Sequence, residues 1–301
     1  MTPIAFLIFN RPDTTLKVFE AIREAKPPLL MVVADGPRQD KPGEAEKCAA
    51  TRKIIAQVDW QCEVRTLYSD VNLGCKRRVA SGLSWVFTQV EEAIILEDDC
   101  LPHPTFFRFC EELLDYYRDD KRIMVISGDN YQFGRQRTEY SYYFSRYNHC
   151  WGWATWRRAW KYYDMEMKLW PKIRDEGGLR CILEDSKAIK YWSNILQKTY
   201  AGEIDTWDFQ WTFACWVQSG LTILPDVNLV SNIGFGPEAT HTKDSGNHSA
   251  NLPVQAMGFP LQHPPLVIRQ TEADAFTQRN HFDNHNIMRR IVRKTKKLFK
   301  I

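Results

Sequence analysis

Short hydrophobic runs alternate with amphipathic segments along the first 130 residues. Runs bounded by turn residues predict buried strands at Ile4–Phe9, Leu29–Ala34, Cys62–Tyr68, Ala93–Leu96 and Ile123–Ser127. Between them, apolar positions at helical spacing predict helices at Thr14–Glu24, Glu44–Gln57, Lys76–Val90 and Pro104–Arg118. Strands that alternate with helices of this length indicate a mostly parallel sheet with helices on both faces.

The pattern changes after residue 130. Aromatic alternation at Tyr140–Tyr147 predicts an antiparallel edge strand, and Leu221–Leu224 predicts another short strand. Helices are predicted at Gly152–Tyr163, Leu183–Tyr200 and Trp207–Ser219, whereas Phe235–Leu252 reads as a loop. We expect one α/β unit with a sheet-rich half at 1–130, a more helical half at 131–283, and a tail at 284–301.

Composition narrows the class of protein. The chain has 301 residues, of which 44% are hydrophobic and 26% charged, and this excludes disordered and coiled-coil proteins. No apolar run approaches the ~20 residues of a membrane helix, and no signal peptide is expected. The eight cysteines include no CxxC pair, which favours reduced thiols in a cytoplasm over a zinc or disulfide framework.

Charge is concentrated at the C-terminus. Met288–Ile301 carries seven cations and no acid, so the rest of the chain is net negative, which argues against a nucleic-acid-binding body. Cations interspersed with Ile, Val, Leu and Phe predict a surface helix on anionic lipid, and hence a cytoplasmic protein peripheral on the inner membrane face. A solvated terminus or a tail that binds nucleic acid are the alternatives.

Polar residues follow four of the predicted strands: Asn10-Arg11, Asp35-Gly36, Glu97-Asp98-Asp99 and Asp129-Asn130. Ligands of open parallel sheets bind at the carboxyl ends of the strands, so we expect a site where these residues converge. The chain has no GxGxxG after its first strand and no GxxxxGK[ST], which disfavours a Rossmann dehydrogenase and a P-loop enzyme.

The three successive acids at 97–99 are the most informative of these strand ends. Their charges repel each other, and a divalent cation offsets that repulsion. Carboxylate and phosphate oxygens suit Mg²⁺ or Mn²⁺. The alternative is that Asp99 serves the dipole of the following helix.

Several short motifs appear in a shared order. They are Phe9-Asn10-Arg11-Pro12, Val33-Ala34-Asp35-Gly36, Asn72-Leu73-Gly74, Ile95-Leu96-Glu97-Asp98-Asp99, Ser127-Gly128-Asp129-Asn130, Gly152-Trp153, Trp207-Asp208-Phe209-Gln210-Trp211 and Gly234-Phe235-Gly236. Over roughly residues 3–245 this order resembles the GT-A glycosyltransferase superfamily, in detail the N-acetylglucosaminyltransferase I type and bacterial nucleotide-diphospho-sugar transferases. The resemblance implies a GT-A-like α/β fold, a Rossmann-like mixed sheet flanked by helices with a helical C-terminal part.

The resemblance also assigns roles. It implies that Asp99 binds the metal, and His241 is a further candidate ligand in a loop over the donor. It implies nucleotide-sugar contacts at Asn10, Arg11, Asp35, Lys76, Glu97, Asp98, Gly152 and Trp153. It makes Asp208 the general base, although Phe209-Gln210 replaces a second acid of the relatives.

Physical chemistry supports some of these roles and leaves alternatives. Trp207 and Trp211 give Asp208 an apolar surround, which makes a carboxylate a better base, and Asp205 is the alternative base or the cap of the helix. Asp129, Asn130 and Trp207 are candidates for the acceptor. Trp151, Trp153 and Trp156 are candidates for stacking on sugar, or they form the aromatic face of a helix that packs into the core. Arg77 and Arg78 either assist a diphosphate or lie on a solvated helix face.

The sequence therefore predicts a metal-dependent, inverting glycosyltransferase that is a hexosyl- or N-acetylhexosaminyl-transferase. We expect a UDP-sugar donor, a glycan or lipid-linked glycan acceptor of a surface polysaccharide, and Mn²⁺ or Mg²⁺ as cofactor. A sugar-phosphate nucleotidyltransferase and a non-catalytic carbohydrate-binding protein on the same fold are the rivals. Asn10-Arg11-Pro12-Asp13 lacks the Gly-rich loop that the first rival needs.

Overall fold

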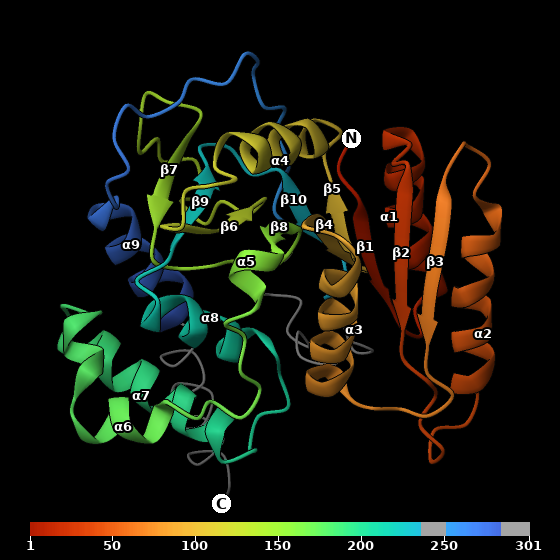
Figure 1. Ribbon diagram of the computed structural model, residues 1–301, viewed down its shortest axis with the longest axis horizontal. Coiled ribbons are helices and arrows are strands. Elements are labelled where there is room, and N and C mark those ends of the chain that lie inside the picture. The colour runs from red at the N-terminus through yellow and green to blue at the C-terminus, as the bar shows by residue number, and fades with distance from the viewer. Residues whose placement is uncertain (236–250, 284–301) are drawn as a thin grey trace, which may run out of the picture.

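The computed structural model describes residues 1–235 and 251–283 (Figure 1). The first half alternates between strands and helices, as the sequence predicts. Its elements are β1 (Ile4–Ile8), α1 (Pro12–Ala25), β2 (Leu29–Ala34), α2 (Glu44–Ile54), η1 (Ile55–Gln57), β3 (Glu63–Tyr68), α3 (Cys75–Gln89), β4 (Glu92–Glu97), β5 (Cys100–Pro102), α4 (Thr105–Tyr116) and β6 (Ile123–Ser127).

The second half adds the remaining strands and a group of helices. Its elements are β7 (Tyr142–Ser145), β8 (Trp153–Trp156), α5 (Arg157–Trp160), α6 (Trp170–Asp175), η2 (Gly178–Cys181), α7 (Ser186–Tyr200), α8 (Asp208–Val217), β9 (Leu221–Pro225), β10 (Val230–Asn232), α9 (Thr271–Thr277) and the π-helical turn η3 (Gln278–Asp283). The helical C-terminal part is thus confirmed.

Eight strands form one mixed sheet in the order β3-β2-β1-β4-β8-β6-β9-β7. The strands β3, β2, β1 and β4 are parallel, and β8 runs antiparallel to both of its neighbours. The predicted antiparallel edge strand is confirmed by β7, which lies at the end of the strand order and runs antiparallel to β9. A second, two-stranded sheet joins β10 to β5. The sheet flanked by helices is the α/β architecture that the resemblance to the GT-A superfamily implies.

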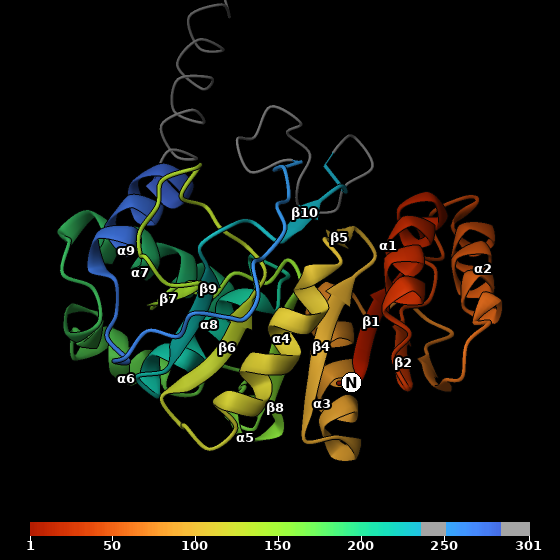
Figure 2. The ribbon, with the colours of Figure 1, turned by 90° about the horizontal axis from the view of Figure 1, so that it is seen from above.

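Alternation along the strands gives each face of the sheet its own core. Ile4, Phe6 and Ile8 face α1 and α4, whereas Ala5 and Leu7 face α3. Figure 2 shows α1 and α2 on one side of β1 and β2, with α3 on the other. A third core, built largely from Trp170, Trp192 and Trp216, joins α6, α7 and α8.

The helix predicted at Gly152–Tyr163 is wrong over its first half. Trp153–Trp156 forms the strand β8, which lies inside the sheet between β4 and β6. All four residues of β8 are buried, so both faces are apolar and no alternation shows in the sequence. A short apolar run of this kind cannot be assigned to a strand or a helix from periodicity alone.

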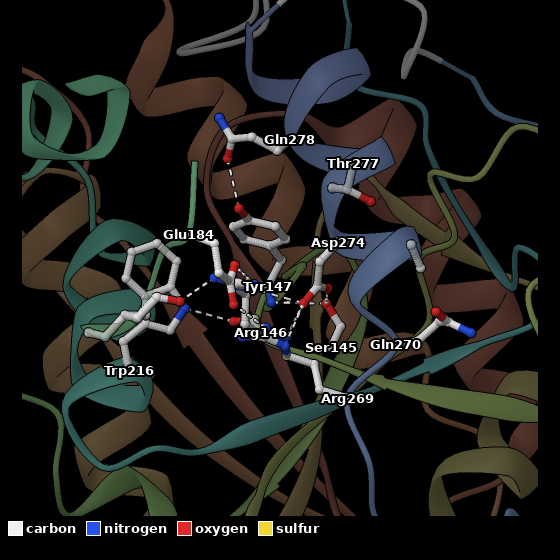
Figure 3. Close-up of polar contacts among 12 residues, drawn as sticks. Ser145, Arg146, Tyr147, Glu184, Trp216, Arg269, Gln270, Asp274, Thr277 and Gln278 are labelled. Atoms are coloured by element: carbon white, nitrogen blue, oxygen red, sulfur yellow. Dashed lines mark hydrogen bonds and ion pairs between the residues drawn. The ribbon is translucent and has the colours of Figure 1, made fainter. Parts of the chain in front are cut away.

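An ion-pair network fastens the last described segment to the sheet (Figure 3). Asp274 of α9 is 2% exposed, and its Oδ2 lies 3.2 Å from Nε of Arg146, which is 7% exposed. Ser145 Oγ donates to Asp274 Oδ1 at 2.5 Å, and Glu184 binds both Arg146 and Arg269. Because α9 has only seven residues, it depends on these tertiary contacts, and the sequence pattern did not predict it.

No helix within the described ranges is long and apolar enough to cross a bilayer. The tail Met288–Ile301 and the candidate ligand His241 lie outside the described residues.

Substitution of Asp274 tests the ion-pair network. Asp274→Ala leaves the buried Arg146 with only the exposed Glu184 as counter-charge, and we expect the free energy of unfolding to fall by about 3 kcal/mol. Urea denaturation measures this change. Glu272→Ala on the same helix is the control, because Glu272 is 84% exposed and should cost under ~0.5 kcal/mol. Equal losses in the two variants would contradict the prediction.

Candidate active site

A cavity of about 480 Å³ opens at the carboxyl ends of β1, β2 and β4. Polar and charged residues from both halves of the chain line it: Asn10, Arg11, Asp35, Arg38, Asn72, Arg78, Glu97, Asp98, Asp99, Asp205, Thr206, Asp208 and Asn232. Strand order reverses between β1 and β4, because β2 and β3 extend on the far side of β1. The cavity therefore lies at the switch point where ligands of open α/β sheets bind.

The acidic triplet is tied to the end of β1. The backbone N–H of Phe9 donates to Asp98 Oδ2 at 3.0 Å, and Arg11 Nη1 donates to Asp99 Oδ2 at 2.8 Å. Because β1 and β4 are parallel neighbours, both strand ends reach the same edge of the sheet. Register thus brings together residues that lie almost ninety positions apart in the sequence.

Glu97, Asp98 and Asp99 all lie in an environment that disfavours their charge. Burial raises the pKa of Glu97 well above its usual value, and the neighbouring charges of Asp99, Asp98 and Asp208 raise it further. Burial and the charge of Asp99 likewise raise the pKa of Asp98. Burial also raises the pKa of Asp99, although Arg11 partly offsets it. One arginine therefore faces more negative charge than it neutralises.

The oxygen ligands of this edge fit a divalent cation. The side chain of Glu97 makes no hydrogen bond within residues 1–235 and 251–283, so its carboxylate oxygens are available to a ligand in the cavity. Within those ranges, no group of three or more His, Cys, Asp or Glu side chains is arranged to surround an ion. Carboxylate ligands suit Mg²⁺ and Mn²⁺, and Mg²⁺ is commonly held by one or two carboxylates with phosphates and water completing its coordination.

The segment that leaves β10 packs directly on the triplet. The backbone N–H of Ile233 donates to Asp99 O at 2.8 Å. Gly234 follows, and a Cβ atom at this position would collide with Asp99 Oδ2 and Arg11 Nη1. Only glycine allows this close approach, because any side chain would push the backbone away from the acids.

Asp205 and Asp208 reach the cavity from the start of α8. Thr206 Oγ1 donates to Asp208 Oδ1, and Asp208 is the first residue of the helix. Trp207 lines the cavity and stacks on Trp153 with ring centroids 5.5 Å apart. No side chain caps the N-terminus of α8, so the alternative role of Asp205 as its cap finds no hydrogen bond here. Asp205 instead lies against Gly74, just before α3.

Asp35 is buried, and both of its carboxylate oxygens accept hydrogen bonds from the protein. Gly36 N and Leu73 N donate to Oδ1, both at 2.9 Å. Gly74 N and Asn72 Nδ2 donate to Oδ2, both at 3.1 Å. Burial nevertheless raises the pKa of Asp35, because it outweighs these bonds. The side chain organises the turn that leads into α3.

Five of the sequence-predicted residues do not line the cavity: Lys76, Asp129, Asn130, Gly152 and Trp153. Trp153 is fully buried among Trp160, Trp207 and Trp211, so its ring serves the core. Asn130 is buried as well, and its Nδ2 donates to Pro225 O at 2.7 Å.

Asp129 lies beneath the cavity wall. It is 1% exposed, and its Oδ2 accepts from Trp151 N at 3.1 Å. Its Oδ1 has no hydrogen-bond partner among the described residues. Burial raises the pKa of Asp129 well above its usual value. Trp151 itself lines the cavity and contacts Tyr131 and Phe235 edge to face.

Sequence reasoning missed several lining residues, namely Arg38, Cys75, Cys150 and Asn232, and the buried Glu44 behind Arg38. Arg38 follows the strand-end motif Asp35-Gly36 by two residues, so a longer window after β2 would have included it. Asn232 lies on β10, a three-residue strand without a pattern of its own. Arg78 lines the cavity and does not lie on a solvated helix face: it is 7% exposed and donates to Leu67 O on β3.

No family model matches the chain, and no curated protein matches it either. Solved structures give distant matches. The galactosyltransferase LgtC, in complex with donor and acceptor sugar analogs, is 12% identical with a TM-score of 0.39 over 92% of this chain and 94% of its own. The 4-diphosphocytidyl-2C-methyl-D-erythritol synthase from Anaerococcus prevotii is 10% identical with a TM-score of 0.38 over 74% and 88% of the two chains. HddC from Yersinia pseudotuberculosis is 9% identical with a TM-score of 0.29 over 42% of this chain, and this chain spans 57% of HddC.

The buried Asp129 generates a pH-dependent prediction. When burial raises the pKa of an acid in the folded state, the unfolded chain loses the proton at a lower pH than the folded chain does. Above that pH the unfolded state is favoured, so stability falls as pH rises. Stability should therefore fall as pH rises above ~4, the value of an unfolded aspartate, and Asp129→Asn should remove this loss. We expect the variant to be more stable than the parent at pH 7 and the difference to vanish near pH 3.5. Urea denaturation across this range measures it.

The exposed Asp119→Asn is the matched control for this experiment, and its stability should follow that of the parent at every pH. A difference between Asp129→Asn and the parent that is constant with pH would contradict the buried-proton explanation.

Proposed function

We propose that this protein is a glycosyltransferase that moves a sugar from a nucleotide-diphospho-sugar to a glycan acceptor. One observation carries the proposal: a single cavity at the switch point of the sheet gathers the acidic triplet, Arg11 and the pair Asp205 and Asp208. The residues come from the ends of β1 and β4 and from the start of α8, far apart in the sequence, as the resemblance to GT-A transferases implies.

A divalent cation, Mn²⁺ or Mg²⁺, would be held by Asp99 and Glu97 together with the donor's phosphates. When bound, it would neutralise the charge that develops on the nucleotide-diphosphate leaving group. Arg11 adds a positive charge beside this position, because its Nη1 lies 2.8 Å from Asp99 Oδ2. The candidate ligand His241 remains a proposal from the sequence.

Asp208 is the proposed general base. Its Oδ1 accepts from Thr206 Oγ1, which fixes the carboxylate and leaves Oδ2 to accept the proton of the acceptor hydroxyl. The deprotonated acceptor oxygen then attacks the anomeric carbon of the donor sugar, while the bond between that carbon and the diphosphate breaks. Direct attack of this kind inverts the configuration at the anomeric carbon. Asp205, which is exposed at the cavity rim, is the alternative base.

The finer features of the substrate remain proposals from the sequence. They are a UDP-sugar donor of the hexosyl or N-acetylhexosaminyl class and a lipid-linked or surface-polysaccharide acceptor. The basic residues of Met288–Ile301 support contact with an anionic membrane at the cytoplasmic face.

Binding of the donor tests the proposed function. We expect a nucleotide-sugar to raise the unfolding temperature in the presence of Mn²⁺ and not in the presence of EDTA, because a ligand that binds only the native state stabilises it. A panel of UDP-, GDP-, CMP- and dTDP-sugars identifies the nucleotide. Asp99→Asn should abolish the Mn²⁺-dependent shift, while Asp119→Asn should keep it. A folded protein that responds to none of these donors would contradict the proposal.

The catalytic role of Asp208 has a separate test. Asp208→Asn should lower the rate of transfer about 10²- to 10⁴-fold and leave donor affinity unchanged, because only proton transfer is lost. Asp205→Asn serves as the matched control and should retain most of the rate. If Asp205→Asn loses transfer and Asp208→Asn keeps it, the base is Asp205.

A further inference from the structure

The connection between β6 and β7, residues 128–141, carries an exposed aromatic side chain beside α9 (Figure 2). Gln132 Nε2 fastens this connection to the helix, because it donates to Ala273 O at 3.3 Å and to Thr277 Oγ1 at 2.9 Å. Phe133 comes next and is 40% exposed. Its ring centroid lies 6.4 Å from that of Phe276 on α9. The two rings therefore belong to one patch of the surface.

The backbone directs the Phe133 ring outward. Its φ of +51° lies in the left-handed region, which bulky side chains rarely adopt. Gly134 follows with a φ of +80°, and a Cβ atom there would meet nothing within 4 Å, so the tip of this turn faces open space. The fold thus holds an apolar ring in water in an unfavourable backbone conformation. A partner that removes the ring from water would offset this cost.

Two arginines add positive charge to the same patch. The guanidinium carbons of Arg135 and Arg137 lie 4.6 and 5.1 Å from the centroid of the Phe276 ring. Arg137 Nη1 lies 3.9 Å from the carboxylate of Glu272, which partly balances its charge. Arg135 is exposed and makes no ion pair within residues 1–235 and 251–283. The patch therefore presents an uncompensated cation beside an exposed ring.

The position of the patch in the chain indicates the sign of its partner. The helix α9 continues directly into η3, which ends at Asp283. The sequence that follows includes the seven cations of Met288–Ile301 and no acid among those fourteen residues. A surface bearing Arg135 thus lies on the element from which the most basic part of the chain departs. Both would be attracted to an anionic partner.

We infer that Phe133 and Arg135 form a docking surface on the folded part of the chain for an anionic lipid bilayer. The Phe133 ring enters the boundary between headgroups and acyl chains, where aromatic side chains are favoured, and the Arg135 guanidinium binds lipid phosphate. The inference goes beyond the proposed transfer of sugar and does not depend on it. Tyr131, two residues before Phe133, contacts Trp151 of the cavity wall, so docking would place that wall beside the bilayer.

Flotation of the full chain with lipid vesicles tests the surface. One set of vesicles is phosphatidylcholine alone, and the other is phosphatidylcholine and phosphatidylglycerol in equal parts. We expect the parent to bind only the second set. Phe133→Asn/Arg135→Gln should lower the partition coefficient about tenfold, because it removes one apolar contact and one cation at the membrane surface. Asparagine adopts left-handed backbone readily, so the turn is retained.

The matched control lies on α1, which Figure 1 shows towards the opposite end of the sheet from α9. Leu16→Gln/Lys17→Gln removes an apolar side chain that is 39% exposed and a neighbouring exposed cation. It changes net charge and exposed apolar surface much as the first variant does, and it should keep the partition coefficient of the parent.

A Phe133→Asn/Arg135→Gln variant that binds like the parent overturns the inference, and so does an equal loss in the control. Equal binding of the parent to both sets of vesicles, or to neither, overturns it as well. Should the double variant fail to fold, Arg135→Gln alone should lower the partition coefficient about fivefold. None of these outcomes bears on the donor-dependent rise in unfolding temperature, so the proposed function stands or fails separately.

Variation of the tail separates its contribution from that of the docking surface. Lys296→Gln/Lys297→Gln should weaken binding to the anionic vesicles, and the loss should add to that of Phe133→Asn/Arg135→Gln when the two are combined. If the tail variant alone abolishes binding and the Phe133 and Arg135 variant changes nothing, the tail is the membrane contact and the inferred surface is not.

Discussion

Carboxylates at the buried end of β4 are energetically unfavourable in their charged form, and the arrangement of the cavity follows from how the fold compensates for this. Burial and mutual repulsion raise the pKa values of Glu97 and Asp98. The fold meets this cost with a guanidinium from Arg11 and a backbone N–H from Phe9, both supplied by the end of β1. The parallel pairing of β1 and β4 is therefore an electrostatic requirement as well as a packing one. The triplet therefore keeps more negative charge than Arg11 neutralises.

Other buried acids of the site are likewise compensated by hydrogen-bond donors. Asp35 is paired with backbone N–H groups, and Glu44 with Asn10 and Arg38. Asp35 thereby fixes the turn before α3, and Glu44 fixes the two connections that follow β1 and β2. Glu97 and Asp208 Oδ2 also line the cavity, and they accept no such set of hydrogen bonds from the residues that the structure describes. Positioning and reactivity are thus divided among residues of similar chemistry.

The sequence predicted the first half of the fold well, because its strands and helices carry local periodicities. It failed at Trp153–Trp156, where a strand buried on both faces looks like any apolar run, and at α9, which tertiary ion pairs stabilise. Strand-end polarity correctly indicated the cavity at Asn10, Asp35 and Glu97. It misplaced Asp129 and Asn130, because a polar residue at a strand end can equally serve a buried turn. Partners such as Glu44 and Asn232 require knowledge of the three-dimensional contacts.

The last described turn of the chain touches the wall of the cavity through two rings. His281 of η3 stacks on Tyr131 with centroids 4.2 Å apart, and Tyr131 contacts Trp151. Together with the ion pairs of Asp274, this stacking holds α9 and η3 against the part of the fold that forms the cavity. The position of Asp283 relative to the opening of the cavity is therefore set by the fold.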